Sequence, residues 1–201
     1  MNLDELKTGD ILLFQSKKWC WKCPLSFLSF MIEKCTHSNY SHSGIVMKNP
    51  NFINKKGLYI LESTGFENVP DVEDGKIKFG VQLRDLNEVL NDFEGSIYVR
   101  SLECKRDSKF YNILTKAHAA VHNKPYDVLD YFSVFLKDDL HVKIEKLKKE
   151  NTFFCSALCA YLYTKWGFLD IDWTTVTPGD LSSKGNLVFS NCILSTEKLL
   201  K

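Results

Sequence analysis

The chain has 201 residues, of which 44% are hydrophobic and 13% aromatic, so it can build one domain with a packed core. Twenty-six Lys and Arg stand against twenty-five Asp and Glu, and this balance excludes a strong overall field for nucleic acid or an acidic membrane. No apolar run approaches the roughly 18 residues of a membrane-spanning helix, and the start "MNLDELKTGDILLF" has no secretory-signal pattern. We therefore expect a single cytoplasmic domain over residues 1–201, with no integral membrane segment and no nucleic-acid partner.

The first half of the chain predicts strands and one short helix. Residues 7–15, "KTGDILLFQ", indicate a turn followed by an apolar strand, and residues 24–33, "PLSFLSFMIE", indicate an amphipathic helix that begins with a proline. The runs "HSGIVMK" (42–48) and "GLYILEST" (57–64) predict a hairpin with a long loop. Residues 65–80 are rich in turn-forming residues and predict a loop.

The second half predicts more helix. A short helix is expected near "LRDLNEVL" (83–90), then a strand "GSIYVRSL" (95–102) and a longer helix over 108–122. In "FFCSALCAYLYTKWG" (153–167) apolar residues recur at helical spacing, and Gly167 is a natural end for that helix. Strands that come first and a core helix that comes late favour an α+β fold with a small antiparallel sheet.

Seven cysteines without regular spacing argue against a disulfide framework and for free thiols. Cys155 falls in the first turn of the late helix, where the helix dipole and unpaired amides stabilise a thiolate and an oxyanion. Its neighbour Ser156 adds a small polar group that could contact a substrate. A buried, unreactive cysteine is the alternative reading of this position.

A nucleophilic thiol needs a base, and the base needs an acceptor that orients it. His42 opens one strand of the predicted hairpin and Glu62 lies near the end of the other, so both side chains could project from one face. Gly44, two residues after His42, would leave room for a thiol or substrate beside the imidazole. Taken singly, His42 and Glu62 also read as an ordinary strand-edge histidine and a solvent-facing carboxylate.

Two other groups could hold a metal. His118 and His122 are four residues apart on a helix, but the sequence shows no acidic partner beside them, which favours a structural or solvated pair. "CWKC" followed by "CTH" offers Cys20, Cys23, Cys35 and His37, yet the second half has irregular spacing for zinc. We expect no metal or other cofactor, with zinc on this second set as the alternative. Trp19 and Trp21 beside the short helix leave peripheral membrane contact open.

An ordered set of motifs resembles a known family. "TGDILLF", "NYSHSGIV", "YILEST", "NKPYDVLDY", "FFCSAL" and "TPGDL" follow one another from about Thr8 to Leu181, as in the circularly permuted papain-like amidases, or YiiX-like proteins. This family is similar to the NlpC-class cysteine peptidases and to the lecithin:retinol acyltransferase group, and the order histidine, acid, cysteine is the permuted one. The resemblance is carried by the set rather than by any single motif.

The resemblance implies a permuted papain-like fold in which Cys155 is the nucleophile, His42 the base and Glu62 its orienting acid. It also implies that Tyr126, in "KPYD", contacts the substrate or oxyanion. Glu62 and "FFCSAL" favour the amidase side, because the acyltransferases typically carry a second histidine. We therefore expect a thiol hydrolase acting on a small-molecule, peptide or lipid acyl substrate. The alternatives are a lipid acyltransferase or thioesterase on the same triad, and a catalytically silent peptide- or lipid-binding module.

Overall fold

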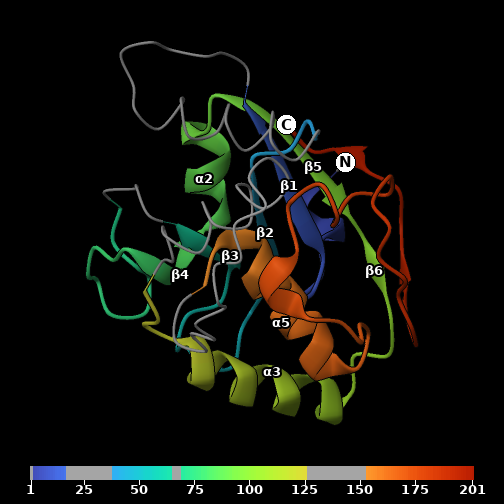
Figure 1. Cartoon of the computed structure of the whole chain (residues 1–201). Helices are drawn as coiled ribbons and strands as arrows, with labels where there is room; N and C mark the ends of the chain where they lie inside the picture. Colours follow the sequence, from blue (N-terminus) through green and yellow to red (C-terminus); the bar gives the residue numbers. More distant parts are fainter. Residues whose placement is uncertain (1, 17–37, 65–68, 126–152) are drawn as a thin grey trace, which may run out of the picture.

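A six-stranded antiparallel sheet is the main element of the computed structural model, which describes residues 2–16, 38–64, 69–125 and 153–201. Its strands, in the spatial order β4-β3-β2-β1-β5-β8, are Gly80–Asp85, Leu58–Thr64, His42–Lys48, Ile11–Ser16, Gly95–Arg100 and Lys198–Leu199. The short strands β6 (Leu102–Glu103) and β7 (Ile193–Leu194) form a separate pair. Figure 1 shows the sheet passing behind α5.

Within the described ranges, three α-helices accompany the sheet: α2 (Leu86–Asp92), α3 (Ser108–Val121) and α5 (Cys155–Trp166). Two short 3₁₀ helices, Leu3–Glu5 and Trp173–Thr175, complete the described elements. Asp85 and Asp107 cap α2 and α3 by accepting hydrogen bonds from first-turn amides. Helix α5 ends at Gly167, whose φ of 76° is the left-handed conformation that glycine adopts at low cost.

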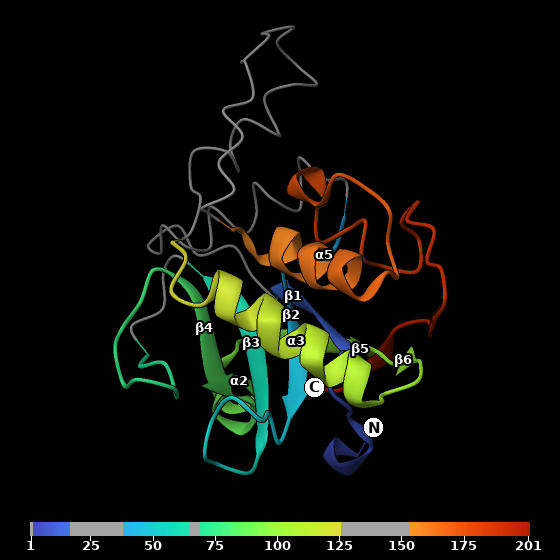
Figure 2. The same cartoon turned by 90° about the horizontal axis from the view of Figure 1, so that it is seen from below.

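The sheet buries side chains on both faces because alternate residues of a strand point to opposite sides. Ile45, Met47 and Leu61 face the side covered by α3 and α5, whereas Val46 and Ile60 face the side on which α2 packs. Figure 2 shows α3 and α5 side by side on their face of the sheet. Helix α5 therefore packs on β2 and β3 with α3 at its side, and the end that carries Cys155 lies close to β2.

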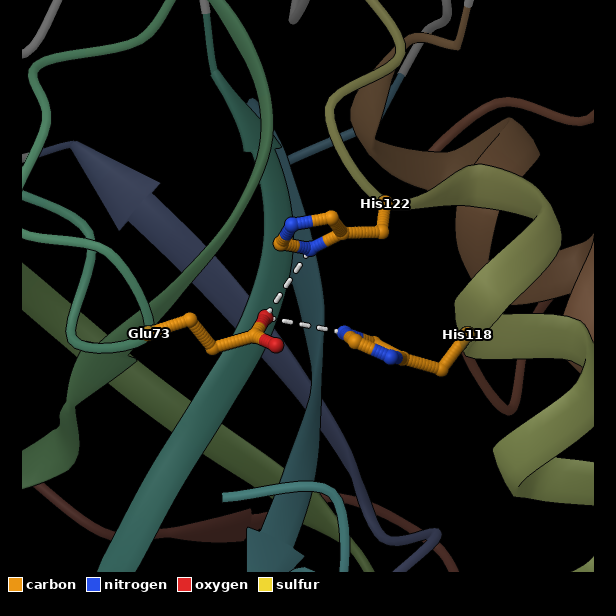
Figure 3. A group of neighbouring side chains, drawn as sticks. All are labelled: Glu73, His118 and His122. Atoms are coloured by element: carbon orange, nitrogen blue, oxygen red, sulfur yellow. Dashed lines mark hydrogen bonds and ion pairs between the residues drawn. The ribbon is translucent and has the colours of Figure 1, made fainter. Parts of the chain in front are cut away.

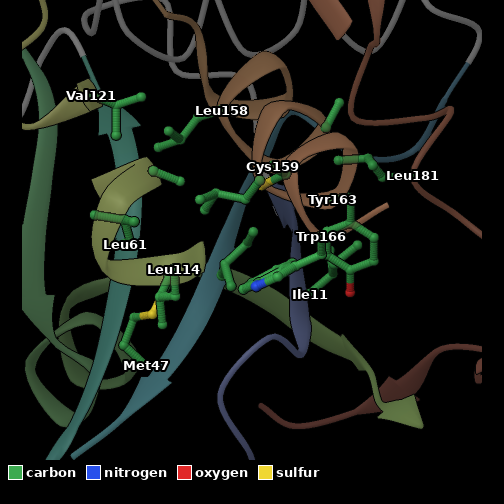
Figure 4. Close-up of a cluster of buried hydrophobic side chains, with 14 of the residues drawn as sticks. Ile11, Met47, Leu61, Leu114, Val121, Leu158, Cys159, Tyr163, Trp166 and Leu181 are labelled. Atoms are coloured by element: carbon green, nitrogen blue, oxygen red, sulfur yellow. The ribbon is translucent and has the colours of Figure 1, made fainter. Parts of the chain in front are cut away.

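Helix α5 is anchored by aromatic side chains in the larger core (Figure 4). The Tyr163 hydroxyl donates to the Gly9 carbonyl oxygen at 2.7 Å, and the Trp166 ring stacks on Phe110 with a centroid separation of 4.5 Å. Truncating a large core side chain of this kind typically costs about 3–5 kcal/mol. These contacts fix the position of the helix, and with it the position of its first residue.

The "TGD" segment has a structural purpose. The buried Asp10 carboxylate accepts from the backbone amides of Lys7 and Leu102, each at 2.9 Å, and lies 3.4 Å from Arg106. Burial raises the pKa of Asp10, against the opposing effect of these hydrogen bonds and of Arg106. Gly9, at φ 100°, passes so close to Leu102 that a side chain would collide. Through Asp10, the motif therefore connects the start of β1 to Leu102 and Arg106, which follow β5 in the chain.

Most of the predicted elements are confirmed. The hairpin is β2 and β3, the helix over 108–122 is α3, and the late helix begins at Cys155 and ends at Gly167. The mixed α+β class and antiparallel sheet agree with the sequence analysis. The helix expected over 24–33 lies outside the described residues. In the described ranges, no helix combines the length and apolar character needed to cross a membrane.

The region after the hairpin differs from the prediction. Residues 80–85 form strand β4, paired along its length with β3, where the sequence analysis expected the end of a loop and the start of a helix. The helix expected near 83–90 begins only at Leu86, after the Asp85 cap. The alternation of Val81 and Leu83 with Gln82 and Arg84 is a strand pattern, but it covers only four residues, and both polar residues are buried.

Candidate active site

Cys155 is the first residue of α5, and the residue before it leaves the helix end open. Phe154 holds the N-cap position in extended conformation and makes no side-chain capping bond. The backbone amides of Ser43 and Ser156 donate to the Cys155 sulfur. A sulfur at this position accepts hydrogen bonds that a capping side chain would otherwise take, which favours the negatively charged thiolate.

The strand β2 contributes to the site because its pairing with β3 ends early. The register runs from Lys48 opposite Leu58 to Ile45 opposite Leu61, and beyond it the Ser43 amide bonds the Cys155 sulfur. The end of the hairpin therefore meets the start of α5. This is the part of the fold that brings His42 to the thiol.

His42 lies between a carboxylate and the thiol. Its Nε2 is 2.6 Å from Glu62 Oε2, and its side chain also hydrogen bonds with Cys155. Since Nε2 is taken by Glu62, Nδ1 is the ring nitrogen left for the thiol. The imidazole packs against Phe14, with ring centroids 5.0 Å apart, and keeps 24% of its side-chain surface exposed.

Glu62 is buried in β3 between two cationic partners. Its Oε1 lies 3.6 Å from Arg84 Nη1 on β4, while Oε2 faces His42. Gln82 lies directly opposite Glu62 in the strand register. Its amide group is buried and has no hydrogen-bond partner among the residues that the structure describes. The guanidinium compensates the buried carboxylate charge, so that Glu62 can orient His42 without being expelled toward solvent.

The thiol and the imidazole shift each other's pKa in opposite directions. Burial opposes ionisation of Cys155, but the His42 charge and the hydrogen bonds to the sulfur outweigh it and lower the pKa of the thiol. Burial likewise disfavours the charged form of His42, yet Cys155 and Glu62 raise the pKa of the imidazole. The pair is thus stabilised as thiolate and imidazolium, the form that a nucleophilic cysteine needs.

Cys159, one helical turn further along α5, is a second buried cysteine whose thiol pKa can be compared with that of Cys155. Its sulfur lies 3.7 Å from the Ser43 hydroxyl, and burial raises the pKa of this thiol far above its usual range. The thiol of Cys192 is also shifted upward by burial, to a pKa of about 11. Of the four cysteines in the part of the chain that the structure describes, only Cys155 has its thiol pKa lowered, toward the thiolate.

The structure brings together three of the five predicted site residues: Cys155, His42 and Glu62. Ser156 is fully buried and its hydroxyl donates to the Val176 carbonyl oxygen at 2.7 Å, so only its backbone amide faces the sulfur. Tyr126 lies outside the described residues, and so does the set Cys20, Cys23, Cys35 and His37.

Two expectations from the sequence are wrong. A side chain at Gly44 would collide with Ile60 at 2.5 Å, so the missing side chain makes room for a neighbouring strand residue rather than for a thiol or substrate. His118 and His122 do have an acidic partner, because both contact Glu73 from the loop before β4. Sequence reasoning also missed Arg84, for which a charged residue in the short run "GVQLRD" was the available signal.

Comparison with known proteins supports the fold. The structure is similar to the crystal structure of metalloprotein yiiX (DUF1105) from Escherichia coli O157:H7, with a TM-score of 0.53 and 18% sequence identity over 96% of this chain and 97% of that one. No family model and no curated protein matches the sequence. The chain therefore shares its fold with yiiX over nearly its whole length.

Proposed function

We propose that this protein is a papain-like thiol hydrolase of permuted architecture that cleaves an amide or ester through a thioester on Cys155. The observation that carries the proposal is the position of His42, which hydrogen bonds with both the Cys155 thiol and the Glu62 carboxylate. The fold-level likeness to yiiX over nearly the full length supports the permuted order, in which the histidine and acid precede the cysteine.

In the first step the thiolate attacks the acyl carbonyl carbon. A carbon–sulfur bond forms, and the negative charge moves to the carbonyl oxygen, where amides at the open start of α5 can donate to it. The His42 imidazolium then gives its proton to the leaving nitrogen or oxygen as its bond to the carbonyl carbon breaks. The acyl group remains on Cys155 as a thioester.

In the second step His42 removes a proton from a water molecule, and the resulting hydroxide attacks the thioester carbonyl. Collapse of the intermediate breaks the carbon–sulfur bond, releases the acid and restores the thiolate and imidazolium. Acid–base help of this kind is typically worth about 10² to 10⁴ in rate. Glu62 holds the ring and stabilises its positive charge in both steps, with Arg84 behind it.

The carboxylate at the third position favours an amidase or peptidase over an acyltransferase in this proposal. The neighbour yiiX is described as a metalloprotein. The acyl-transfer steps above need only the thiolate, the imidazole and backbone amides.

The test is selective alkylation of the full-length protein with iodoacetamide between pH 5 and 9, followed by peptide mass spectrometry. Cys155 should react rapidly at pH 6, while Cys159 and the partly exposed Cys104 and Cys192 remain slow, since the pKa values of those three are raised. Uniform slow labelling of all thiols would rule out the enzyme and favour a silent binding module.

The acyl group can be identified by trapping. Incubation with a cell extract followed by rapid acid quenching should leave an adduct on Cys155, and its added mass names the acyl group. A Cys155→Ala protein provides the control for non-specific adducts.

A further inference from the structure

A second cluster of chemistry-bearing side chains lies away from Cys155. Glu73, His118 and His122 converge on one point in Figure 3, with Glu73 Oε2 2.9 Å from His118 Nε2 and 3.1 Å from His122 Nδ1. All three donor atoms lie within 4.8 Å of one another. The two histidines are four residues apart on α3 and so share one face of the helix, while Glu73 comes from the loop between β3 and β4.

The loop that carries Glu73 is held in place by backbone and side-chain bonds. The buried Asp71 carboxylate accepts from the Glu73 amide at 2.7 Å and from Lys78 Nζ at 2.7 Å. Val72 donates to the Leu83 carbonyl oxygen on β4, which ties the loop to the sheet. Glu73 is therefore positioned before any ligand arrives.

The histidines are also fixed. The His118 ring stacks on Phe52 with centroids 3.8 Å apart and planes 8° apart, and its side chain is almost fully buried. His122 ends α3, and its amide donates to the His118 carbonyl oxygen at 2.7 Å. Its side chain is 28% exposed. The cluster is thus exposed to solvent at His122, whereas His118 is held in place by its packing against Phe52.

We propose that Glu73, His118 and His122 bind a divalent transition-metal ion, for which zinc is the best match. Two imidazoles and one carboxylate are a common zinc donor set, and bonds of about 2.0–2.1 Å place tetrahedral ligand atoms roughly 3.3 Å apart. The hydrogen-bonded separations of 2.9 and 3.1 Å reach that value with shifts of a few tenths of an ångström. A fourth position remains for water.

The charges around the cluster suit a cation. Asp71 and Asp74 both pair with Lys78, which also acts on Glu73, and Asp74 interacts with Lys76 as well, so three carboxylates face two ammonium groups. An open pocket of about 330 Å³ is lined by Asp74 and Asn123, the residues that follow Glu73 and His122, and by Lys76, Lys78 and Lys124. Because the ligands come from α3 and the β3–β4 loop, a bound ion would clamp this loop to the helix.

The experiment is a zinc titration of chelator-treated full-length protein by isothermal calorimetry. All titrations use the Cys155→Ala protein as parent, so that zinc cannot bind the reactive thiol, and the result is independent of the proposed hydrolase activity. The parent should bind one equivalent of zinc. With zinc at 100-fold above Kd, its melting temperature should rise by about 5–10 °C.

Glu73→Gln and His122→Asn change partly exposed side chains, so both variants should fold. Each should weaken zinc binding at least about 100-fold, since loss of a direct ligand exceeds the 10- to 100-fold effect of losing an outer partner. Cys20→Ser is the control for the alternative thiol set and should bind as the parent does. Circular dichroism of the apo proteins checks that they fold.

Cobalt gives an independent readout of the ligands. Bound Co²⁺ should show visible bands without an intense near-ultraviolet thiolate band, because the proposed donors are nitrogen and oxygen. The proposal is overturned by a parent that binds no zinc, by unchanged binding in Glu73→Gln and His122→Asn, by loss of binding in Cys20→Ser, or by a thiolate band.

Discussion

Glu62 and Glu73 both hold histidines at hydrogen-bonding distance, and their surroundings differ in ways that matter chemically. Glu62 lies 2.6 Å from His42 and is buried beside Arg84, whereas Glu73 lies 2.9 Å from His118 and 3.1 Å from His122 beside Lys78. At the first site the third group is a thiol at a helix start. At the second site it is another imidazole.

The third group decides what each pair can do. Beside a thiol, the imidazole gains a proton donor, and the two shift toward thiolate and imidazolium. Beside a second imidazole, burial opposes ionisation of Glu73, but both histidines and Lys78 outweigh it and lower the pKa of the carboxyl. The result is an anionic oxygen between two nitrogen donors. A glutamate–histidine contact therefore predicts neither catalysis nor metal binding until its third neighbour is known.

The largest expected effect comes from His42→Ala, with His122→Ala as its matched control. Loss of the imidazolium removes the charge that stabilises the thiolate, so the pH midpoint for alkylation of Cys155 should rise toward the value of about 8.5 for an ordinary thiol. At pH 5 the alkylation rate should fall by at least about tenfold. His122→Ala should leave the profile unchanged, and an unchanged profile in His42→Ala would contradict the assignment of the base.

A smaller effect in the same direction is expected for Glu62→Gln. The amide keeps the shape of the side chain but removes the charge that raises the pKa of His42, so the imidazolium and with it the thiolate lose part of their stabilisation. Alkylation of Cys155 at pH 6 should slow by roughly threefold. Glu73→Gln is the control and should not alter the rate. Equal slowing in both variants would point to a general loss of stability, which melting temperatures would reveal.

The candidate thiol site could be predicted from the sequence to a large extent because each residue sits at a recognisable boundary. His42 opens a strand with strong β propensity, and Cys155 opens a helix whose apolar spacing and final Gly167 are plain in the sequence. Their meeting follows from the hairpin end lying against the start of α5. Local pattern was enough to place these elements.

The second cluster could not be predicted because it depends on contacts between distant residues. Glu73 stands in a loop without periodicity and reaches a helix 45 residues further along the chain. Arg84 reads as a surface charge until Glu62 is placed next to it. Gly44 is a further example. The sequence shows that this residue has no side chain, but it does not show that Ile60 on the next strand fills the space beside it.

The Asp71→Asn variant should separate the two sites. Asp71 does not belong to the proposed donor set but holds the Glu73 amide and Lys78, so its loss should loosen the loop and weaken zinc binding by about tenfold. Alkylation of Cys155 should be unaffected, because the contacts of Asp71 among the described residues are with Glu73, Gly75, Lys76 and Lys78, away from the thiol site. Calorimetry and alkylation on the same protein measure both. Unchanged zinc affinity would show that the loop is fixed without Asp71.

The smallest effect is expected for Cys159→Ala, which tests whether α5 or its first residue makes Cys155 reactive. Cys159 shares the helix and Ser43 with Cys155, but burial keeps its thiol protonated. Removing its sulfur should cost about 1 kcal/mol of unfolding free energy through a small cavity and a weak hydrogen bond. This corresponds to roughly 2–4 °C in melting temperature. The alkylation profile of Cys155 should stay as in the parent protein. A slowing of tenfold or more would mean that the second thiol takes part in activating the first, and that the helix start and His42 are insufficient by themselves.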